Sequence, residues 1–404
     1  MRTLILTLAA IAALAASTAF AQVALDPAHP RAIANILSWR GEEQARGYRT
    51  IETIFKTRVV KRGDHVHPLP AAGRTIAPAW THDGKSWTID SYMAAGRVSG
   101  LLVIQDGKVV LERYGLGRGP TDRWTSFSVA KSLTSTLVGA AIKDGKIKSI
   151  DDPVTRYIPE LRGSAYEGVS VRQMLMMSSG VKWNEDYTDM NSDVARAGQK
   201  VEERGVDPMV SYLRRLPRAH PPGSTFHYNT GETDLVGVLV EKASGEPMAQ
   251  YASEKIWKPY GMEQDAVWMT DPGGVERGGC CISMTLRDYG RLAQFVLDGG
   301  VAGGKRVLPE WWTREATKKQ IALDDPKAPP GAGYGWFWWI SGPDEYDARG
   351  IFGQAIATFP KERLIIVQNA AWPAATGKPL SAARAAMFAA VKAAATAPAR
   401  HNSP

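Results

Sequence analysis

The chain has 404 residues, 44% of them hydrophobic and 22% charged, a composition typical of globular proteins and not of disordered or fibrous ones. Lys and Arg outnumber Asp and Glu by 49 to 41, which gives a net charge of +8. The basic residues are scattered, in runs no longer than two such as Lys318-Lys319, whereas nucleic-acid-binding proteins gather them in a patch. We therefore expect no nucleic-acid partner.

The N-terminus has the pattern of a secretory signal peptide. A positive Met1-Arg2-Thr3 precedes an apolar stretch from Leu4 to Ala16, and Ala19-Phe20-Ala21 fits a cleavage site before Gln22. We expect residues 1–21 to be removed, which leaves a periplasmic or secreted protein. No later apolar run is long enough for a stable membrane span. A buried N-terminal helix is the alternative interpretation.

Cysteine and histidine usage gives no sign of a cofactor. The two cysteines are adjacent, at Cys280-Cys281, and a bond between neighbours forces an unusual peptide geometry, so we expect two buried thiols. The seven histidines contain no His-Glu-x-x-His pattern and no Cys/His pairing at ligand spacing. Glycine motifs for nucleotides are also missing. We expect no metal and no other cofactor.

The predicted secondary structure changes type twice along the chain. An N-terminal arm, residues 22–80, carries one amphipathic helix from Ile33 to Arg46, and an Asp106-Gly107 turn then joins two strands in a hairpin. Residues from about 126 to 298 are mostly helical. Strands return in the last third, before an Ala-rich helix at 382–394. The predicted strands are 100–105, 108–113, 334–340, 350–358 and 364–368, and the main central helices follow Ser128 or cover 232–242 and 285–297.

Strands at both ends of the chain with helices between them predict an α+β fold. We expect an antiparallel β-sheet formed by the N- and C-terminal segments, with flanking helices and a mostly helical lobe. A single domain would cover residues 81–404, with the helical lobe inserted at about 146–298. A cleft between the lobes would hold a small molecule. The sequence does not indicate an oligomeric state.

A serine followed three residues later by lysine occurs twice, at Ser128-Val-Ala-Lys131 and Ser179-Gly-Val-Lys182. Ser179 precedes Gly180 at the end of a helical run, whereas Ser128 opens a long helix, where unpaired N–H groups can stabilise an oxyanion. Lys131 lies one turn further along, and a desolvated lysine loses its proton easily and can serve as a base. An N-capping serine beside a solvated lysine fits the local sequence equally well.

Two further segments could complete a catalytic site. Tyr228 lies on a predicted loop before a helix, where a neighbouring lysine ammonium would favour its phenolate and let it shuttle protons. A tyrosine in this position can also be a packing residue. In the predicted strand 350–358, Gly353 permits close backbone approach, and an edge N–H there could complete an oxyanion hole with that of Ser128.

Taken in order, these segments resemble the β-lactamase-related serine hydrolases, which include class C β-lactamases, DD-peptidases, family VIII carboxylesterases and 6-aminohexanoate-dimer (nylon oligomer) hydrolases. The likeness spans about Val98 to Ala371 and is greatest to the nylon-oligomer-hydrolase branch. It rests on Trp124-Thr-Ser-Phe-Ser-Val-Ala-Lys131, Leu175-Met-Met-Ser-Ser-Gly180, Trp183-Asn-Glu-Asp-Tyr187, Tyr228-Asn229-Thr230, Gly279-Cys-Cys-Ile-Ser283, Leu286-Arg-Asp288 and Gly350-Ile-Phe-Gly-Gln354.

The resemblance implies a β-lactamase/transpeptidase-like fold and an acyl-enzyme mechanism, in which water releases the acid from an acylated serine. Ser128 resembles the nucleophile, Lys131 the base or proton relay and Tyr228 the general acid/base. Tyr187 resembles a substrate-contacting tyrosine. Gln354 follows the glycine of the last motif, so its backbone N–H is expected as the second oxyanion donor beside Gly353.

Two departures from the family pattern bear on the substrate. The asparagine of the Tyr-x-Asn signature is displaced by one position, to Asn229. The Lys-Thr-Gly motif is replaced by Ile351-Phe352-Gly353, which removes the cation that would pair with a β-lactam or peptide carboxylate. We therefore expect an exported hydrolase of a small amide or ester, similar to 6-aminohexanoate-oligomer hydrolases. The alternatives are a family VIII-type carboxylesterase, a β-lactamase or DD-peptidase, and a catalytically silent binding protein of the same fold.

Overall fold

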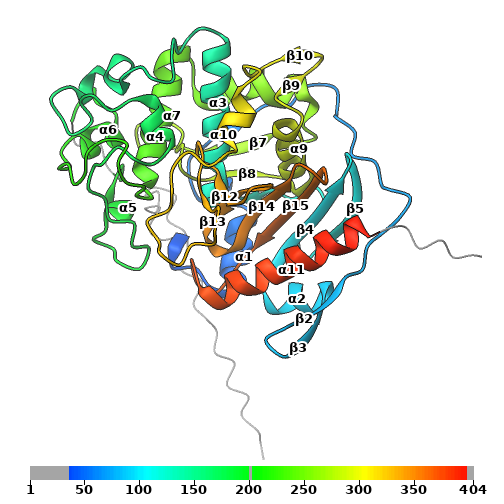
Figure 1. The fold of residues 1–404 in the computed structure, drawn as a ribbon. Helices are drawn as coiled ribbons and strands as arrows, with labels where there is room; N and C mark the ends of the chain where they lie inside the picture. The colour runs from blue at the N-terminus through cyan, green and yellow to red at the C-terminus, as the bar shows by residue number, and fades with distance from the viewer. Residues whose placement is uncertain (1–35, 200–202, 398–404) are drawn as a thin grey trace, which may run out of the picture.

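The computed structural model describes residues 36–199 and 203–397, and a seven-stranded antiparallel sheet lies at its centre (Figure 1). The strand order is β11-β12-β13-β14-β15-β4-β5. The early strand β4 (Val98–Gln105) pairs with β15 (Leu364–Ala370) from the far end of the sequence. This pairing confirms the predicted α+β fold, whose sheet is shared by both ends of the chain. The signal peptide predicted at residues 1–21 lies outside the described residues.

The elements have the following bounds. The helices are α1 Gly41–Arg49, α2 Ile89–Ala95, α3 Ala130–Lys143, α4 Val171–Leu175, α5 Asp193–Arg196, α6 Pro208–Leu213, α7 Thr230–Ser244, α8 Met248–Ala252, α9 Leu286–Leu297, α10 Trp312–Ala316 and α11 Lys378–Thr396. The remaining strands are β1 Thr57–Val60, β2 Ala79–His82, β3 Lys85–Thr88, β5 Lys108–Tyr114, β6 Trp124–Thr125, β7 Ala266–Met269, β8 Ile282–Met284, β9 Val301–Ala302, β10 Lys305–Arg306, β11 Gly333–Tyr334, β12 Trp339–Gly342, β13 Glu345–Gly350 and β14 Gln354–Phe359.

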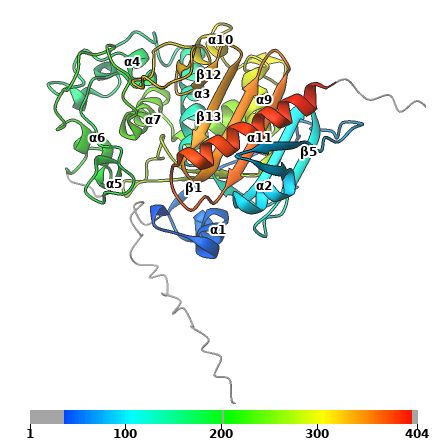
Figure 2. The same cartoon turned by 60° about the horizontal axis from the view of Figure 1, so that its bottom comes forward.

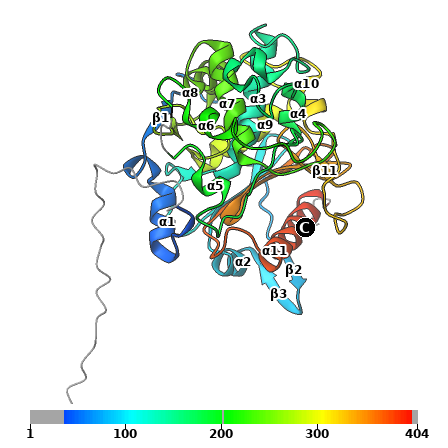
Figure 3. The ribbon, with the colours of Figure 1, turned by 90° about the vertical axis from the view of Figure 1, so that its left-hand side faces the viewer.

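Helices cover both faces of the central sheet. Alternate side chains of β4 point to opposite faces, so that Leu102 and Ile104 pack with α9 in one apolar cluster while Leu101 and Val103 join α2 and α11 in another. Figure 3 shows the sheet between these two layers, and Figure 2 shows α11 lying across the strands. Because both faces are buried, β4 and β15 are almost continuously apolar instead of alternating.

The predicted turns and helix ends are formed by the expected residues. Asp106 and Gly107 both have positive φ, 50° and 73°, as a tight hairpin turn between β4 and β5 requires. Gly245, with φ of 82°, ends α7 in the left-handed conformation that glycine adopts without strain. The α3, α7, α9 and α11 helices all lie where the sequence predicted them, within a few residues.

Two predicted strands are interrupted in the structure. The expected strand 334–340 is split into β11 and β12 around a turn at Phe337, which has a φ of 60°. The expected strand 350–358 is split where β13 ends at Gly350 and β14 begins at Gln354, with Phe352 at a φ of 58° between them. Positive φ is uncommon for phenylalanine, so neither turn was visible in a strand-like sequence.

The N-terminal arm also differs from its prediction. The helix expected from Ile33 to Arg46 begins only at Gly41 within the described residues and ends at Arg49. The arm then contributes β1, which pairs with β7 in a second, four-stranded sheet ordered β1-β7-β8-β6 that the sequence did not predict. Across residues 36–199 and 203–397 no helix is both long and apolar enough to cross a membrane.

Candidate active site

Ser128 lies in a short turn, Phe127–Val129, that leads directly into α3. Phe127 before it has a φ of 43°, and its ring lies 5.3 Å from that of Phe352, the other strained phenylalanine at this site. Tyr48 of α1 packs against both rings, at 5.0 and 5.9 Å between centroids. The arm helix therefore helps to hold two strained backbone positions beside the serine, where such strain is commonly found in enzymes.

The Lys131 amine is buried and faces Ser128. Its Nζ lies 3.2 Å from Ser128 Oγ, and it donates hydrogen bonds to Thr230 Oγ1 at 3.0 Å and to the Gly279 carbonyl at 2.7 Å. The residue is 1% exposed, and burial lowers its pKa to about 8, against the opposing charges of Glu185 and Asp234. An amine that loses its proton near neutral pH can accept the Ser128 proton while still donating to Thr230 and Gly279.

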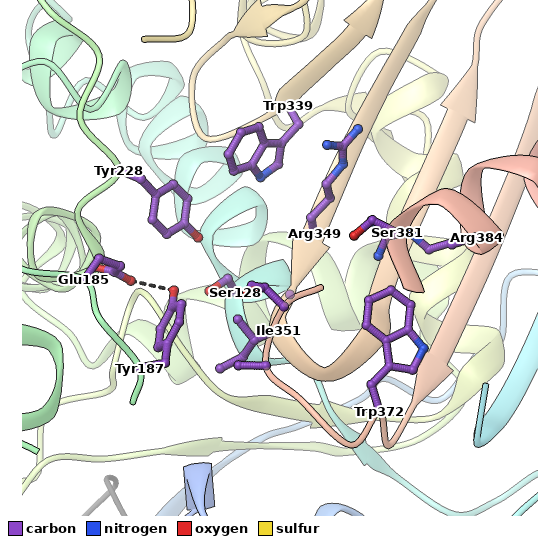
Figure 4. A pocket seen from close by; sticks show the side chains of 13 residues that line it. Ser128, Glu185, Tyr187, Tyr228, Trp339, Arg349, Ile351, Trp372, Ser381 and Arg384 are labelled. Atoms are coloured by element: carbon purple, nitrogen blue, oxygen red, sulfur yellow. Dashed lines mark hydrogen bonds between the residues drawn. The ribbon is translucent and has the colours of Figure 1, made fainter. Parts of the chain in front are cut away.

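Tyr228 reaches the same point from the loop before α7. Its hydroxyl group points toward Ser128 in the pocket that both residues line (Figure 4), Lys131 Nζ lies 5.3 Å from its ring centroid, and its ring stacks on Trp339 at 5.5 Å. Burial raises the pKa of Tyr228, and the negative charge of Glu185 raises it further. The predicted phenolate is therefore wrong, because desolvation and the charge of Glu185 keep the side chain a phenol.

Glu185 and Thr230 were not singled out from the sequence, although both lie within motifs that carried the resemblance. The Glu185 carboxylate accepts hydrogen bonds from Trp183 Nε1, from Tyr187 OH at 2.7 Å, and from the backbone N–H (3.0 Å) and hydroxyl of Thr230. Thr230 thus connects Lys131 to a carboxylate. Sequence spacing does not predict this contact, because Glu185 lies in a loop and Thr230, 45 residues later, is the first residue of α7.

The carbonyl that holds Lys131 is itself fixed from two helices. Gly279 N–H donates to Asp234 Oδ1 of α7 at 2.7 Å, and Asp234 pairs with Arg277 at 2.8 Å in a buried ion pair. Thr134 of α3 donates to the Gly278 carbonyl at 2.7 Å. A Cβ at position 279 would lie 2.8 Å from Thr230 Cγ2 and 3.1 Å from Lys131 Nζ, so only glycine allows this approach.

The structure places the predicted oxyanion residues Gly353 and Gln354 behind the pocket wall. Gln354 is fully buried, and its amide bonds to Trp124, Phe352 and Ala370. Gly350 and Ile351 line the pocket instead, and a Cβ on Gly350 would lie 3.1 Å from Ser128 N. Because a turn breaks the predicted strand, the backbone that lies close to Ser128 is that of Gly350, three residues before the Gly353 that the sequence predicted.

Ser128, Tyr228 and Tyr187 line one pocket of about 290 Å³ (Figure 4). Tyr187 is thus at the pocket, bonded to Glu185. Arg349 of β13 and Arg384 of α11 line the same pocket. The expectation was that loss of the Lys-Thr-Gly motif leaves the site without a cation. That expectation is wrong, because these two arginines bring positive charge to the pocket from other positions in the sequence. Burial, and secondarily Arg349, lowers the pKa of Arg384 to about 10, so it stays charged at neutral pH.

Asn229 and the second Ser-x-x-Lys motif have structural roles. Asn229 caps α7 by accepting from the Glu232 N–H at 3.0 Å, and its side chain also donates to Glu232 at 3.2 Å. Ser179 donates to the same carboxylate, while Lys182 is exposed. Burial raises the pKa of Glu232 to about 8. Ser179 therefore supports the loop that carries Tyr228 and has no lysine beside it.

The adjacent cysteines follow directly after Gly279. The structure joins Cys280 to Cys281 in a disulfide, so the predicted pair of free thiols is wrong. Hydrogen bonds hold the backbone on this stretch: Trp268 Nε1 donates to the Cys280 carbonyl at 3.2 Å, and Met269 N–H donates to that of Cys281 at 3.1 Å.

Comparison with known proteins identifies the family. The β-lactamase family profile matches residues 88–390. The chain belongs to the β-lactamase family. It is 35% identical over 350 residues to the 6-aminohexanoate-dimer hydrolase of Paenarthrobacter ureafaciens, covering 83% of this chain and 88% of that one. A shorter stretch of 153 residues, 36% of this chain and 38% of the relative, is 28% identical to esterase EstB of Burkholderia gladioli.

Solved structures agree on the fold. A provisional 6-aminohexanoate-dimer hydrolase from Bacillus anthracis superposes with a TM-score of 0.75 at 22% identity, covering 85% of this chain and 92% of its own. A family VIII carboxylesterase superposes with a TM-score of 0.58 at 17% identity, covering 74% and 96%. With the sequence relatives, these likenesses make the protein a serine hydrolase of the β-lactamase fold, close to 6-aminohexanoate-dimer hydrolase.

We predict that Gly279→Ala lowers kcat/KM for a p-nitrophenyl ester at least tenfold. The added methyl group would push Thr230 and Lys131 apart, and overpacking of this kind costs about 1–3 kcal/mol. Gly73→Ala is the matched control, since a Cβ there meets nothing within 4 Å. Steady-state kinetics and the thermal midpoint of both variants check this prediction. Wild-type kinetics in Gly279→Ala would contradict it.

Proposed function

We propose that the protein hydrolyses a small amide or ester through an acyl-enzyme on Ser128, in the manner of 6-aminohexanoate-oligomer hydrolases. The observation that carries the proposal is that Tyr228, from a distant segment, lies beside the Ser128–Lys131 pair at one pocket. A binding protein that had lost catalysis would have no need for a lysine amine with a lowered pKa 3.2 Å from a serine hydroxyl.

Each residue has a defined task in acylation. Neutral Lys131 accepts the Ser128 proton while Ser128 Oγ bonds to the substrate carbonyl carbon. Backbone N–H groups of Ser128 and of the Gly350–Ile351 turn stabilise the oxyanion, since both line the pocket close to each other. Tyr228, held as a phenol, gives its proton to the leaving amine or alcohol and regains one from the Lys131 ammonium.

Deacylation uses Lys131 again as the base. Water replaces the leaving group and gives a proton to neutral Lys131 as it bonds to the acyl carbon, and the Lys131 ammonium passes a proton to the Ser128 oxygen when the ester bond breaks. Thr230 and Glu185 keep the amine oriented through both steps, because Thr230 bonds to Lys131 and to the carboxylate at once.

Cleavage of a β-lactam is a second candidate function. Arg349 and Arg384 bring positive charge to the pocket in place of the missing Lys-Thr-Gly lysine, and since Arg349 is paired with Asp347, Arg384 is the partner for a substrate carboxylate. The amide or ester hydrolase remains the stronger proposal because the relative that covers most of the chain is a 6-aminohexanoate-dimer hydrolase.

An active-site fluorophosphonate tests the nucleophile. We predict that wild-type protein is labelled with 1:1 stoichiometry by intact mass and that Ser128→Ala is not labelled. Ser179→Ala, the serine of the other Ser-x-x-Lys motif, is still labelled with 1:1 stoichiometry, at a lower rate because the loop that carries Tyr228 loses a bond to Glu232. Labelling that persists in Ser128→Ala overturns the proposal. A chromogenic cephalosporin in the same assay separates the two functions: turnover faster than that of simple esters favours the β-lactamase.

We also propose that the protein is exported to the periplasm or the medium. The support is the N-terminal sequence itself, in which a short basic start, an apolar stretch and Ala19-Phe20-Ala21 follow in order. We predict that N-terminal sequencing of the mature protein from its native host begins at Gln22. Recovery of a chain that still begins at Met1 from the cytoplasm would contradict this.

A further inference from the structure

A second hollow lies beside the catalytic pocket, between α11 and strands β12–β14. Its volume is about 460 Å³, compared with about 290 Å³ for the catalytic pocket. Its walls combine apolar side chains with a few charged ones, Glu345, Asp347 and Lys392; the apolar ones include Leu323, Ile340, Phe359, Ala385 and Phe388. We call it the distal groove. The catalytic pocket alone is at the small end of the range for ligand sites, which is roughly 300–1,000 Å³.

The distal groove adjoins the catalytic pocket. Four side chains line both hollows: Trp339, Arg349, Ser381 and Arg384. We call these four residues the waist. Figure 4 shows them on β12, β13 and α11, along the side of the pocket away from Glu185 and Tyr187. A substrate that extends from Ser128 past the waist would therefore enter the distal groove without leaving the surface of the protein.

The waist offers flat faces to such a chain. The Arg349 guanidinium is bonded to Asp347 and lies 5.4 Å from the Trp339 ring centroid. The Arg384 guanidinium carbon lies 5.2 Å from the Trp372 ring centroid. Arg384 forms no hydrogen bond or ion pair with any residue that the structure describes. The faces of stacked guanidinium groups and of a tryptophan can pack against methylene groups of a substrate. The N–H groups at their edges can donate hydrogen bonds to a substrate carbonyl.

The arrangement fixes which half of the substrate lies there. Tyr228 stacks on Trp339, and in the proposed reaction Tyr228 donates the proton to the leaving group. Trp339 is also a waist residue, so the leaving group lies at the entrance of the distal groove. The acyl group, bonded to Ser128, lies on the other side of the scissile bond.

We infer that the distal groove binds the apolar chain of the leaving group in a linear amide or ester substrate. This inference rests on the proposed function and deepens it: the enzyme selects its substrate by the length of the amine or alcohol that it releases. A linear oligomer, whose methylene segments alternate with amide groups, matches apolar walls joined by a polar waist.

Butyrate esters of alcohols of different length test the inference. Ethyl and hexyl butyrate form the same acyl-enzyme, so a difference in kcat/KM reports only the leaving-group side of acylation. Burial of each added methylene group should raise kcat/KM by about three- to fourfold, and the hexyl ester should exceed the ethyl ester about tenfold or more even with partial burial. Acid release in a pH-stat measures both.

Two variants of α11 locate the effect. Ala385 is exposed and lines the distal groove, so Ala385→Trp should fill it. We expect this variant to lose the preference for hexyl butyrate while its kcat/KM for ethyl butyrate stays within about twofold. Ala393 is exposed on the same helix outside the groove lining, and Ala393→Trp should leave both rates unchanged.

The outcomes separate this inference from the proposed function. If wild-type protein turns over both esters at equal kcat/KM, the inference is overturned and the hydrolase function stands. The same holds if Ala385→Trp slows both esters equally, because the substitution then acts on the catalytic pocket. If neither ester nor the fluorophosphonate reacts, the proposed function fails and the inference with it.

Discussion

The site depends on one buried amine. Lys131 is enclosed by α3, α7 and the Gly278–Gly279 segment, and it is held by the hydroxyl groups of Ser128 and Thr230 and by a backbone carbonyl. Removing an ammonium from water disfavours its charge, whereas Glu185 and Asp234 favour it, and the balance lowers its pKa to about 8. The surrounding features keep that balance: the Asp234–Arg277 pair fixes the carbonyl, glycine at position 279 makes room, and the four donors around Glu185 keep its carboxylate in place.

Local sequence signals predicted much of the fold and the three central residues. The Asp106-Gly107 hairpin, the Gly245 cap of α7 and the apolar spacing in α3 and α9 depend on residues close together in the chain, and all were formed as expected. The grouping of Ser128, Lys131 and Tyr228 came from short motifs in order, supported by the family resemblance. Placing Tyr228 beside Ser128 needed that resemblance, because the residues are far apart in sequence.

The errors arose where long-range packing decides the conformation. Phe337 and Phe352 adopt positive φ inside strand-like sequences. Because of the turn at Phe352, Gly350 lies beside Ser128 where the sequence predicted Gly353. Tyr228 stays a phenol because of burial and the charge of Glu185. Arg349, Arg384 and Thr230 reach the site from elements whose contacts no spacing rule encodes. The disulfide between the adjacent cysteines was likewise not expected from the sequence.

The pH dependence of acylation tests the role of Lys131 most directly. The rate of labelling by a neutral fluorophosphonate should rise with pH through a midpoint near 8 and level off about one pH unit higher, because the neutral amine is the base and its pKa is about 8. Glu232 has a similar pKa, but only that of Lys131 is raised by Glu185, so Glu185→Gln should move the inflection to lower pH. A rate that is flat from pH 6.5 to 9, or an inflection that Glu185→Gln leaves in place, would contradict the account.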